Sequence, residues 1–356
     1  MGTKAEPGEQ CVVLGGYSEG QTSAVESLQI LRRDVSSPFG WTRSGGLALT
    51  NPTYGVYGHD GQMLYTSHSG QGYLSAVAVD AGEGTLRLLN SSATGSINPA
   101  HLNLSPDGRF VIAASFTSGH VSVLPVHANG ELESAVAVLS TAAEGGPFKG
   151  QTGSQPHQII FSPEGNHVLV PDRGCDRVLV YRFDQLSGHL EPVGAAHLRP
   201  GAGPRHMVFS PMWPRQAYLV NELDNTVTVM EWDDSAERLT PLQVTSTLPS
   251  TFFGTSSGAA IEISRDGRFL FVSNRGHDSI ASFSVSADGL DLTPLGWTPV
   301  GGRTPRFIAL NPEGTQLWVT AQDSSLVQRF AVNASSGRLT LRASTPFPAP
   351  AFVAFT

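Results

Sequence analysis

Short hydrophobic runs separated by polar turns repeat along the whole chain. The clearest copy covers residues 156–183, PHQIIFSPEGNHVLVPDRGCDRVLVYRF, where three runs rich in Val, Ile and Leu are separated by a tight turn and a polar loop. Runs of this length, bounded by Gly, Pro and Asp, are typical of β-strands. A further polar turn and a fourth, shorter run follow each copy. The pattern therefore predicts one four-stranded antiparallel sheet per repeat.

This unit occurs six times in full, at a period typical of β-propellers. The second position of its tight turn is occupied by His59, Pro106, Pro163, Pro211, Arg265 and Pro312. The intervals are 47, 57, 48, 54 and 47 residues, and a propeller blade takes about 40–50 residues. We therefore expect an all-β, seven-bladed β-propeller that forms a single domain over residues 1–356.

The two ends of the chain supply the seventh blade. The C-terminal PAFVAFT matches a first strand with nothing after it, whereas the run from Cys11 matches second and third strands with nothing before them. Joined, they complete one blade. We expect the N- and C-terminal strands to share this blade, because their pairing removes the exposed sheet edges of an open ring.

Composition limits the classes of partner. The net charge is −8, only 15% of residues are charged and no basic tract occurs, so nucleic acid is not expected to bind. No apolar stretch is long enough to span a membrane, and the first ten residues lack the pattern of a signal peptide. We expect a cytoplasmic monomer without membrane contact, in which Cys11 and Cys175 are free thiols.

Strand order divides the polar residues between the two ends of the ring. The start of a first strand and the end of the antiparallel second strand lie at the same end, which we call the mouth, and the tight turns lie at the other. The mouth is expected to hold His68, His101, His157, Asp172, Arg173, Arg205, His206, Glu222, Arg275, Arg306 and Gln322. Such a set suits an anionic small molecule and proton transfer, although a solvated polar rim is the alternative.

The non-repeated polar residues resemble those of a known family. Repeats of SPDGRF and SNRGHDSI, with GPRH, NEL and GGRTPRF between them, are similar to the seven-bladed β-propeller lactonases. Members of that family include a bacterial 6-phosphogluconolactonase and a fungal enzyme that lactonises 3-carboxy-cis,cis-muconate. The resemblance covers the chain from about Tyr54 onward and implies an active-site set of His, Arg, Glu and Arg. The matching residues are His157 of QPH, Arg205 of GPRH, Glu222 of NEL and Arg275 of SNRG.

The resemblance and the mouth residues together favour hydrolysis of a small anionic lactone, without a metal or other cofactor. Either Arg205 or Arg275 would stabilise the oxyanion while the other holds the acidic group of the substrate. Either Glu222 or His157 would act as the base. Two alternatives stay open, namely a lactone-forming cycloisomerase of the carboxymuconate type and a non-catalytic propeller scaffold.

Four further mouth residues are expected to contact the substrate. They are His101, Asp172, Arg306 and Gln322. His101 and His206 lie one residue further into their strands than Arg205 does, so strict alternation would point them away from it. A hydrogen bond between blades is the alternative role for both histidines.

The sequence also contains a G-x-S-x-G segment and a glycine-rich loop, and it lacks a metal-binding pattern. The segment GTSSG around Ser256 fits G-x-S-x-G, but it leads into a strand with no helix after it, so Ser256 is not expected to be a nucleophile. The glycine-rich loop around Lys149 is either a flap over the mouth or a plain connection between blades. No His or Cys pair stands at ligand spacing, so no metal site is expected.

Overall fold

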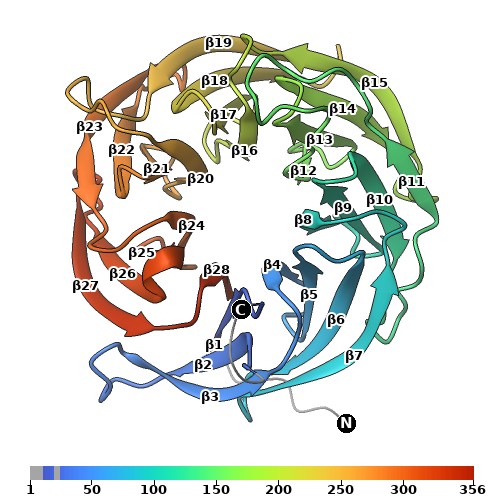
Figure 1. Cartoon of the computed structure of the whole chain (residues 1–356), viewed down its shortest axis with the longest axis vertical. Coiled ribbons are helices and arrows are strands. Elements are labelled where there is room, and N and C mark those ends of the chain that lie inside the picture. The colour runs from blue at the N-terminus through green and yellow to red at the C-terminus, as the bar shows by residue number, and fades with distance from the viewer. Residues whose placement is uncertain (1–10, 20–24) are drawn as a thin grey trace.

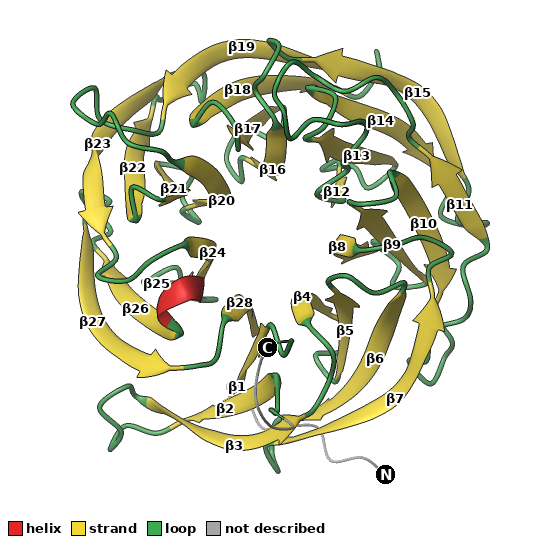
Figure 2. Ribbon diagram, viewed as in Figure 1, coloured by secondary structure: helices red, strands yellow, loops and turns green. Residues whose placement is uncertain are grey.

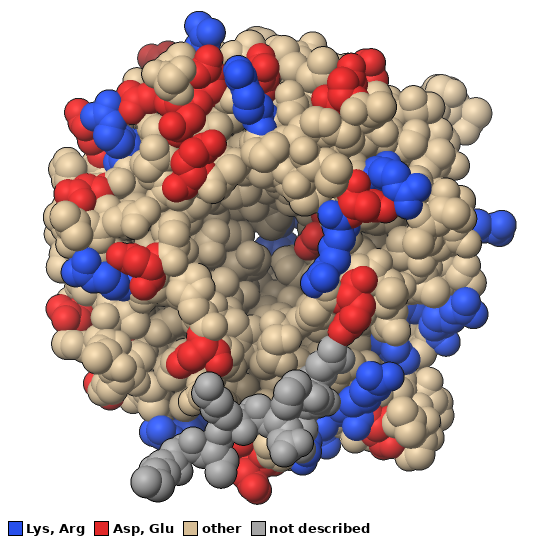
Figure 3. All heavy atoms as spheres, turned by 180° about the vertical axis from the view of Figure 1, so that it is seen from behind, with Lys and Arg blue, Asp and Glu red and all other residues tan. Residues whose placement is uncertain are grey.

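In the computed structural model, which describes residues 11–19 and 25–356, 28 strands form seven four-stranded antiparallel sheets that are arranged in a ring (Figure 1). The helical content of the described residues is one 3₁₀ turn, η1 (Gln322–Ser324) (Figure 2). Viewed from the opposite side, the ring is hollowed at its centre (Figure 3). The seven-bladed β-propeller predicted from the repeat is confirmed.

The strands of each blade are given from the innermost outward. Blade 1 contains β28 (Pro350–Phe355), β1 (Cys11–Gly16), β2 (Leu28–Arg33) and β3 (Trp41–Leu47). Blade 2 contains β4 (Pro52–Tyr57), β5 (Met63–His68), β6 (Tyr73–Asp80) and β7 (Thr85–Ala93). Blade 3 contains β8 (Pro99–Leu104), β9 (Phe110–Ser115), β10 (His120–Pro125) and β11 (Ala137–Ser140). Blade 4 contains β12 (Ile160–Phe161), β13 (His167–Asp172), β14 (Arg177–Phe183) and β15 (Leu190–His197).

The remaining blades follow the same order. Blade 5 contains β16 (Pro204–Phe209), β17 (Gln216–Asn221), β18 (Thr226–Asp233) and β19 (Arg238–Ser246). Blade 6 contains β20 (Ser257–Ile263), β21 (Phe269–Arg275), β22 (Ser279–Val285) and β23 (Leu292–Pro299). Blade 7 contains β24 (Pro305–Leu310), β25 (Gln316–Ala321), β26 (Leu326–Val332) and β27 (Leu339–Pro346).

Blade 1 closes the ring as the sequence predicts. Its innermost strand, β28, pairs antiparallel with β1, for example at Ala354 opposite Val13. The two ends of the chain therefore share a sheet, and each fills the edge that the other would leave unpaired.

The core lies between blades. Alternate residues of a strand face opposite sides of its sheet, so every blade presents an apolar face to each neighbour. Between blades 5 and 6, for example, Tyr218 and Val220 of β17 pack with Ile261 of β20 and Leu270 of β21, all fully or almost fully buried. These layers fix the angle between neighbouring blades and hence the position of every mouth residue.

A one-residue bulge near the mouth interrupts most of the innermost strands. In blade 5 the pairing of β16 with β17 shifts between Pro204 and His206, which leaves Arg205 as the extra residue. The same shift leaves Arg306 unpaired in β24. A bulge breaks the alternation of side chains and can re-aim one of them, so the bulged position is well placed to direct a side chain into the mouth.

The structure also bears on the two cysteines and on membrane-spanning segments. Cys11 is buried and Cys175 is half-buried, and both are free thiols as predicted. No helix among residues 11–19 and 25–356 is long and apolar enough to cross a membrane. The first ten residues, on which the signal-peptide interpretation depends, lie outside the described residues.

Candidate active site

Two positions of the repeat supply the ionisable groups of the mouth. The first is the bulged position of the innermost strand, or its equivalent before β12; it holds His157, Arg205 and Arg306 in blades 4, 5 and 7. The second lies at the end of the second strand or directly after it; it holds Phe116, Arg173, Glu222, Arg275 and Gln322 in blades 3 to 7. Consecutive blades thus present side chains from equivalent places.

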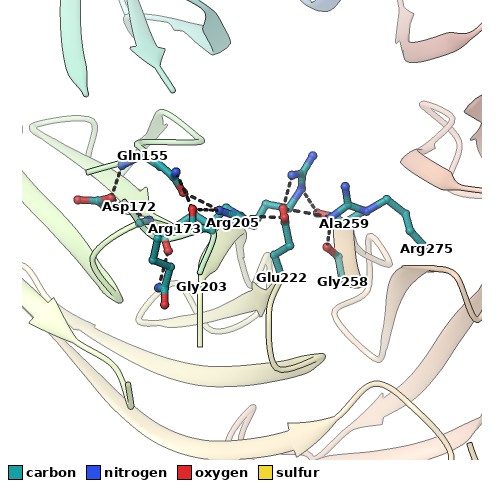
Figure 4. Close-up of polar contacts among 12 residues, drawn as sticks. Gln155, Asp172, Arg173, Gly203, Arg205, Glu222, Gly258, Ala259 and Arg275 are labelled. Carbon is teal, nitrogen blue, oxygen red and sulfur yellow. Dashed lines mark hydrogen bonds and ion pairs between the residues drawn. The ribbon is translucent and has the colours of Figure 1, made fainter. Parts of the chain in front are cut away.

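Glu222 lies at the centre of this cluster (Figure 4). Its Oε1 accepts a hydrogen bond from Nε of Arg173 (2.8 Å), and its Oε2 accepts one from Nη1 of Arg205 (2.5 Å). Nη2 of Arg275 lies 3.1 Å from the same Oε2. Burial alone would raise the pKa of Glu222, but the three guanidinium groups hold it well below its usual range. The carboxylate is therefore ionised and already occupied by donors.

The arginines that flank Glu222 are also fixed by the backbone of β20. Nε of Arg205 donates to the carbonyl of Ala259, and Nη2 of Arg275 donates to that of Gly258, both at 2.9 Å. Burial lowers the pKa of Arg205 to about 9 and the attraction of Glu222 offsets this effect only in part, yet the group stays cationic at neutral pH. Nη2 of Arg205 and Nη1 of Arg275 have no partner among the described residues, so each arginine keeps donors for a ligand.

Three histidine rings meet beside Arg205. The centroid of the His206 ring lies 5.1 Å from that of His157 and 5.5 Å from that of His101. The bulge at Arg205 interrupts the regular alternation on which the prediction for His206 depends, and the ring of His206 lies in one cluster with those of His157 and His101. The hydrogen bond between blades predicted as the alternative role of His101 is confirmed, because its Nδ1 accepts a hydrogen bond from the backbone N–H of Ile159 in the next blade (3.3 Å).

All three histidines are neutral at physiological pH. Burial, followed by the charge of Arg205, lowers the pKa of His101 to about 3 and that of His157 and His206 well below the usual value. Nδ1 of His157 and Nε2 of His206 are buried without a hydrogen-bond partner in the described part of the chain. A neutral imidazole with an unpaired nitrogen can accept a proton.

Arg306 and Gln322 lie at the edge of the cluster. The guanidinium of Arg306 lies over the ring of Tyr17, 5.5 Å from its centroid, and its charge contributes to the lowered pKa of Arg205. Oε1 of Gln322 is buried without a partner among the described residues. Both residues therefore keep polar atoms for a ligand, and their substrate contacts stay predictions.

Asp172 has a different environment. It is fully buried, and its carboxylate accepts hydrogen bonds from Oγ of Ser154 (2.8 Å), the backbone N–H of Gln155 (2.7 Å) and Nε of Arg177 (3.0 Å). These bonds occupy both oxygens. We therefore assign Asp172 to the support of the neighbouring loop and not to substrate binding.

The residue that sequence reasoning undervalued is Arg173, directly after Asp172. The repeat contains the signal, because PDRG, VNEL and SNRG place Arg173, Glu222 and Arg275 at one equivalent position in three consecutive blades. The residues before them, Asp172 and its counterparts, are buried supports. Comparison of these loops by position, and not by residue type alone, would have selected Arg173 in place of Asp172.

The charge of the mouth is positive. Among the described residues, Arg173, Arg205, Arg275 and Arg306 are accompanied by one ion-paired carboxylate, Glu222. Asp172 does not reduce this excess because it pairs with Arg177. An excess of buried and half-buried guanidinium groups is costly to leave without counter-charge and favours an anionic ligand.

Other candidate sites lie apart from this cluster. Within residues 11–19 and 25–356, no group of three or more His, Cys, Asp or Glu residues is arranged to hold a metal ion. A pocket of ≈ 380 Å³ opens between blades 7 and 1, lined by Trp41, Trp318 and Arg329 and by none of the mouth residues. The arginine cluster, and not this pocket, combines convergent charge with unpaired donors.

Comparison with known proteins identifies the family. The model of the family described as "Lactonase, 7-bladed beta-propeller" matches residues 11–355. The chain belongs to the seven-bladed β-propeller lactonases. One relative of this lactonase is the 6-phosphogluconolactonase of Bacillus subtilis, 32% identical over 342 residues, which covers 94% of this chain and 95% of that protein.

Solved structures agree with this assignment. The periplasmic gluconolactonase PpgL of Pseudomonas aeruginosa superimposes with a TM-score of 0.88 at 29% identity, over 97% of this lactonase and 98% of that chain. A protein from Lactobacillus plantarum gives a TM-score of 0.89 at 29% identity, over 98% and 99% of the two chains. The lactonase is thus an enzyme, and the similarity to its relatives extends over the whole ring.

Proposed function

We propose that this lactonase hydrolyses a small lactone that carries an acidic group, with 6-phosphogluconolactone as the first candidate. The observation that carries the proposal is the excess of four arginines over one carboxylate at the mouth. A planar guanidinium suits the bidentate binding of phosphate or carboxylate. The name of the Bacillus subtilis relative supports the choice of the phosphorylated lactone.

In the proposed mechanism, His157 acts as the base. Its neutral imidazole takes a proton from a water molecule while the water oxygen bonds to the lactone carbonyl carbon. Nη2 of Arg205 donates to the oxyanion that forms, and preorganised donors of this kind are worth about 3–4 kcal/mol. The ring C–O bond then breaks, and the imidazolium returns its proton to the leaving oxygen. The product is a hydroxy acid.

We assign Glu222 to the orientation of the arginines and not to proton transfer. Both of its oxygens already accept hydrogen bonds, from Arg173 and Arg205, and Arg275 adds a third cationic partner. A group in this position holds cationic side chains at fixed angles before the substrate arrives. Arg275 and Arg306 would hold the acidic group of the substrate.

The test is turnover of 6-phosphogluconolactone above its spontaneous hydrolysis. We expect Arg275→Ala to lower kcat/KM at least about a hundredfold, whereas Arg342→Ala, on the exposed face of β27, leaves it unchanged. A wild-type rate equal to the spontaneous rate would contradict the proposal. Parallel assays with gluconolactone and 3-carboxymuconate define the substrate.

The same assay tests metal independence. We expect EDTA to leave the rate unchanged, because the proposed oxyanion partner is a guanidinium and not a metal ion. Activity that is lost in EDTA and restored by calcium would overturn this part of the mechanism.

A further inference from the structure

Arg173 connects three parts of the mouth. Its Nε donates to Oε1 of Glu222 (2.8 Å) in the next blade, and its Nη1 donates to Oε1 of Gln155 (2.5 Å) and to the carbonyl of Gly150 (3.3 Å) (Figure 4). Its guanidinium also lies over the ring of Phe116, 5.7 Å from the centroid. The Phe116 ring meets the His157 ring at 5.6 Å. One side chain therefore contacts both Glu222 and the immediate neighbour of the proposed base.

The segment at residues 142–155, which we call the mouth loop, is held by these bonds in addition to those of Asp172. Arg173 reaches it at two points, Gly150 and Gln155, and Nε2 of Gln155 donates to the carbonyl of Gly150 (2.9 Å), which joins the two points to each other. Gln151 adds a bond from its Nε2 to Oδ1 of Asp176 (2.8 Å). The loop carries Lys149, which is exposed.

Arg173 keeps one terminal nitrogen for a ligand. No described residue accepts a hydrogen bond from its Nη2, and 13% of its side chain is exposed, compared with 5% for Arg205. Arg173 and Arg275 thus lie on the two sides of Glu222 as its more accessible partners. An anion bound at Nη2 would share this guanidinium with the mouth loop.

We propose that Arg173 determines substrate specificity by binding the acidic group of the substrate through Nη2, together with Arg275 and Arg306, and that the same guanidinium fastens the mouth loop. This proposal rests on the proposed function for the identity of the substrate, but not for the role of the loop. Lysine cannot replace arginine here, because its single ammonium nitrogen cannot bind Glu222, the mouth loop and a ligand at once, as the three nitrogens of a planar guanidinium can.

Binding is tested with inorganic phosphate by titration calorimetry. Arg173→Met keeps the length of the side chain but removes its charge and donors, and we expect Kd for phosphate to rise at least about tenfold. Arg173→Lys is expected to recover only part of this loss. The matched control is Arg199→Met, because Arg199 forms an exposed ion pair with Asp224 outside the cluster.

Turnover separates specificity from general damage. For Arg173→Met we expect KM for 6-phosphogluconolactone to rise at least about tenfold and kcat to change less than about threefold. If kcat instead falls about tenfold while KM and the Kd for phosphate stay unchanged, Arg173 only supports the fold and the proposal is overturned. Unchanged affinity for phosphate overturns it as well.

The loop is tested with a lysine-specific protease. The chain contains only two lysines, Lys4 and Lys149, so cleavage within the ring is confined to the mouth loop. We expect cleavage after Lys149 to be at least about tenfold faster in Arg173→Met than in the wild type or in Arg199→Met, because opening of the loop limits cleavage. Phosphate is expected to slow cleavage of the wild type only. Equal cleavage rates contradict the fastening role.

These measurements keep the two proposals apart. Failure of the wild type to hydrolyse either lactone would remove the proposed function, while calorimetry and proteolysis still decide the role of Arg173. Turnover with normal phosphate affinity and normal proteolysis in Arg173→Met would leave the proposed function intact and remove the role of Arg173.

Discussion

At the scale of single residues, the environment decides what a carboxylate can do. Glu222 has the residue type of a general base, yet three arginines lower its pKa and occupy its oxygens. A base needs a free lone pair, and the lowered pKa does not distinguish the two candidates, because burial and neighbouring arginines lower the pKa of His157 as well. His157 keeps an unpaired Nδ1 instead. The sequence predicts which groups are present at the mouth, but the pairing among them decides their roles.

The ion pairs of Glu222 give a prediction about stability. Glu222→Gln removes the carboxylate that pairs with Arg173, Arg205 and Arg275, the only one to do so within residues 11–19 and 25–356. It should lower the free energy of unfolding by about 3–5 kcal/mol, the usual cost of breaking a buried pair. Guanidinium chloride unfolding at pH 7 measures this loss. Glu231→Gln, whose partner Arg215 is exposed, should change it by less than about 1 kcal/mol.

This stability difference should depend on pH. The pKa of Glu222 is lowered in the folded state, so its contribution is present above the pKa of the unfolded chain, about 4.3. It is lost as the pH falls below that value toward the folded pKa. Unfolding of wild type and Glu222→Gln should therefore converge in acid. A gap that stays constant between pH 7 and pH 3 would show that Glu222 acts through packing and not through its charge.

The pH dependence of turnover tests His157. Burial and the charges of Arg205 and Arg306 lower its pKa well below 6.5, so the neutral, proton-accepting form persists in mild acid. We expect kcat/KM to be nearly constant from pH 7.5 down to about pH 5.5, and His157→Asn to lose about a hundredfold at every pH in that range. A half-maximal rate near pH 6.5 would indicate an ordinary histidine at the surface and contradict this assignment.

At the scale of elements, the repeat predicts the strands well because every blade combines the same turn chemistry with the same apolar runs. The bulge near the mouth is harder to detect, since it changes hydrogen-bond pairing without a distinctive residue at the extra position: Arg205 in one blade, Arg306 in another. This single shift interrupts the alternation from which the direction of His206 relative to Arg205 is argued. A rule derived from regular strands fails at a functional site that depends on an irregular one.

The loops after the second strands show a second limit of sequence reasoning. Asp172 and Arg173 are adjacent and both polar, and residue type alone favoured the acid. The structure separates them: Asp172 supports the loop through Ser154 and Arg177, and Arg173 reaches the cluster. Equivalent positions in other blades carry this information, because a repeat uses the same geometry each time.

At the scale of the whole molecule, the site is assembled from several blades of one ring. The cluster draws on blades 3 to 7 through Phe116, Arg173, Glu222, Arg275 and Gln322. The apolar layers between neighbouring blades hold these residues relative to one another. The period of the sequence predicts this arrangement, whereas the ion pairs of Glu222 with Arg173 and Arg275 could not be read from it, because these partners lie in different blades.

Closure of the ring gives the last prediction. Phe352 of β28 is fully buried, and its ring packs against Leu64 and Val77 of blade 2. Phe352→Ala should lower the free energy of unfolding by about 3–5 kcal/mol, because a large cavity remains where two blades meet. Phe253→Ala, at a side chain that is 94% exposed, should change it by no more than about 0.5 kcal/mol.

The form of the unfolding curve then tells whether closure acts on the whole ring. If β28 holds all blades together, Phe352→Ala shifts one cooperative transition to lower denaturant, and kcat under native conditions is retained because Glu222 lies in blade 5, across the ring. A separate early transition, with activity preserved through it, would mean that blade 1 opens alone. The mouth would then depend on the packing of blades 3 to 7 and not on the joined ends of the chain.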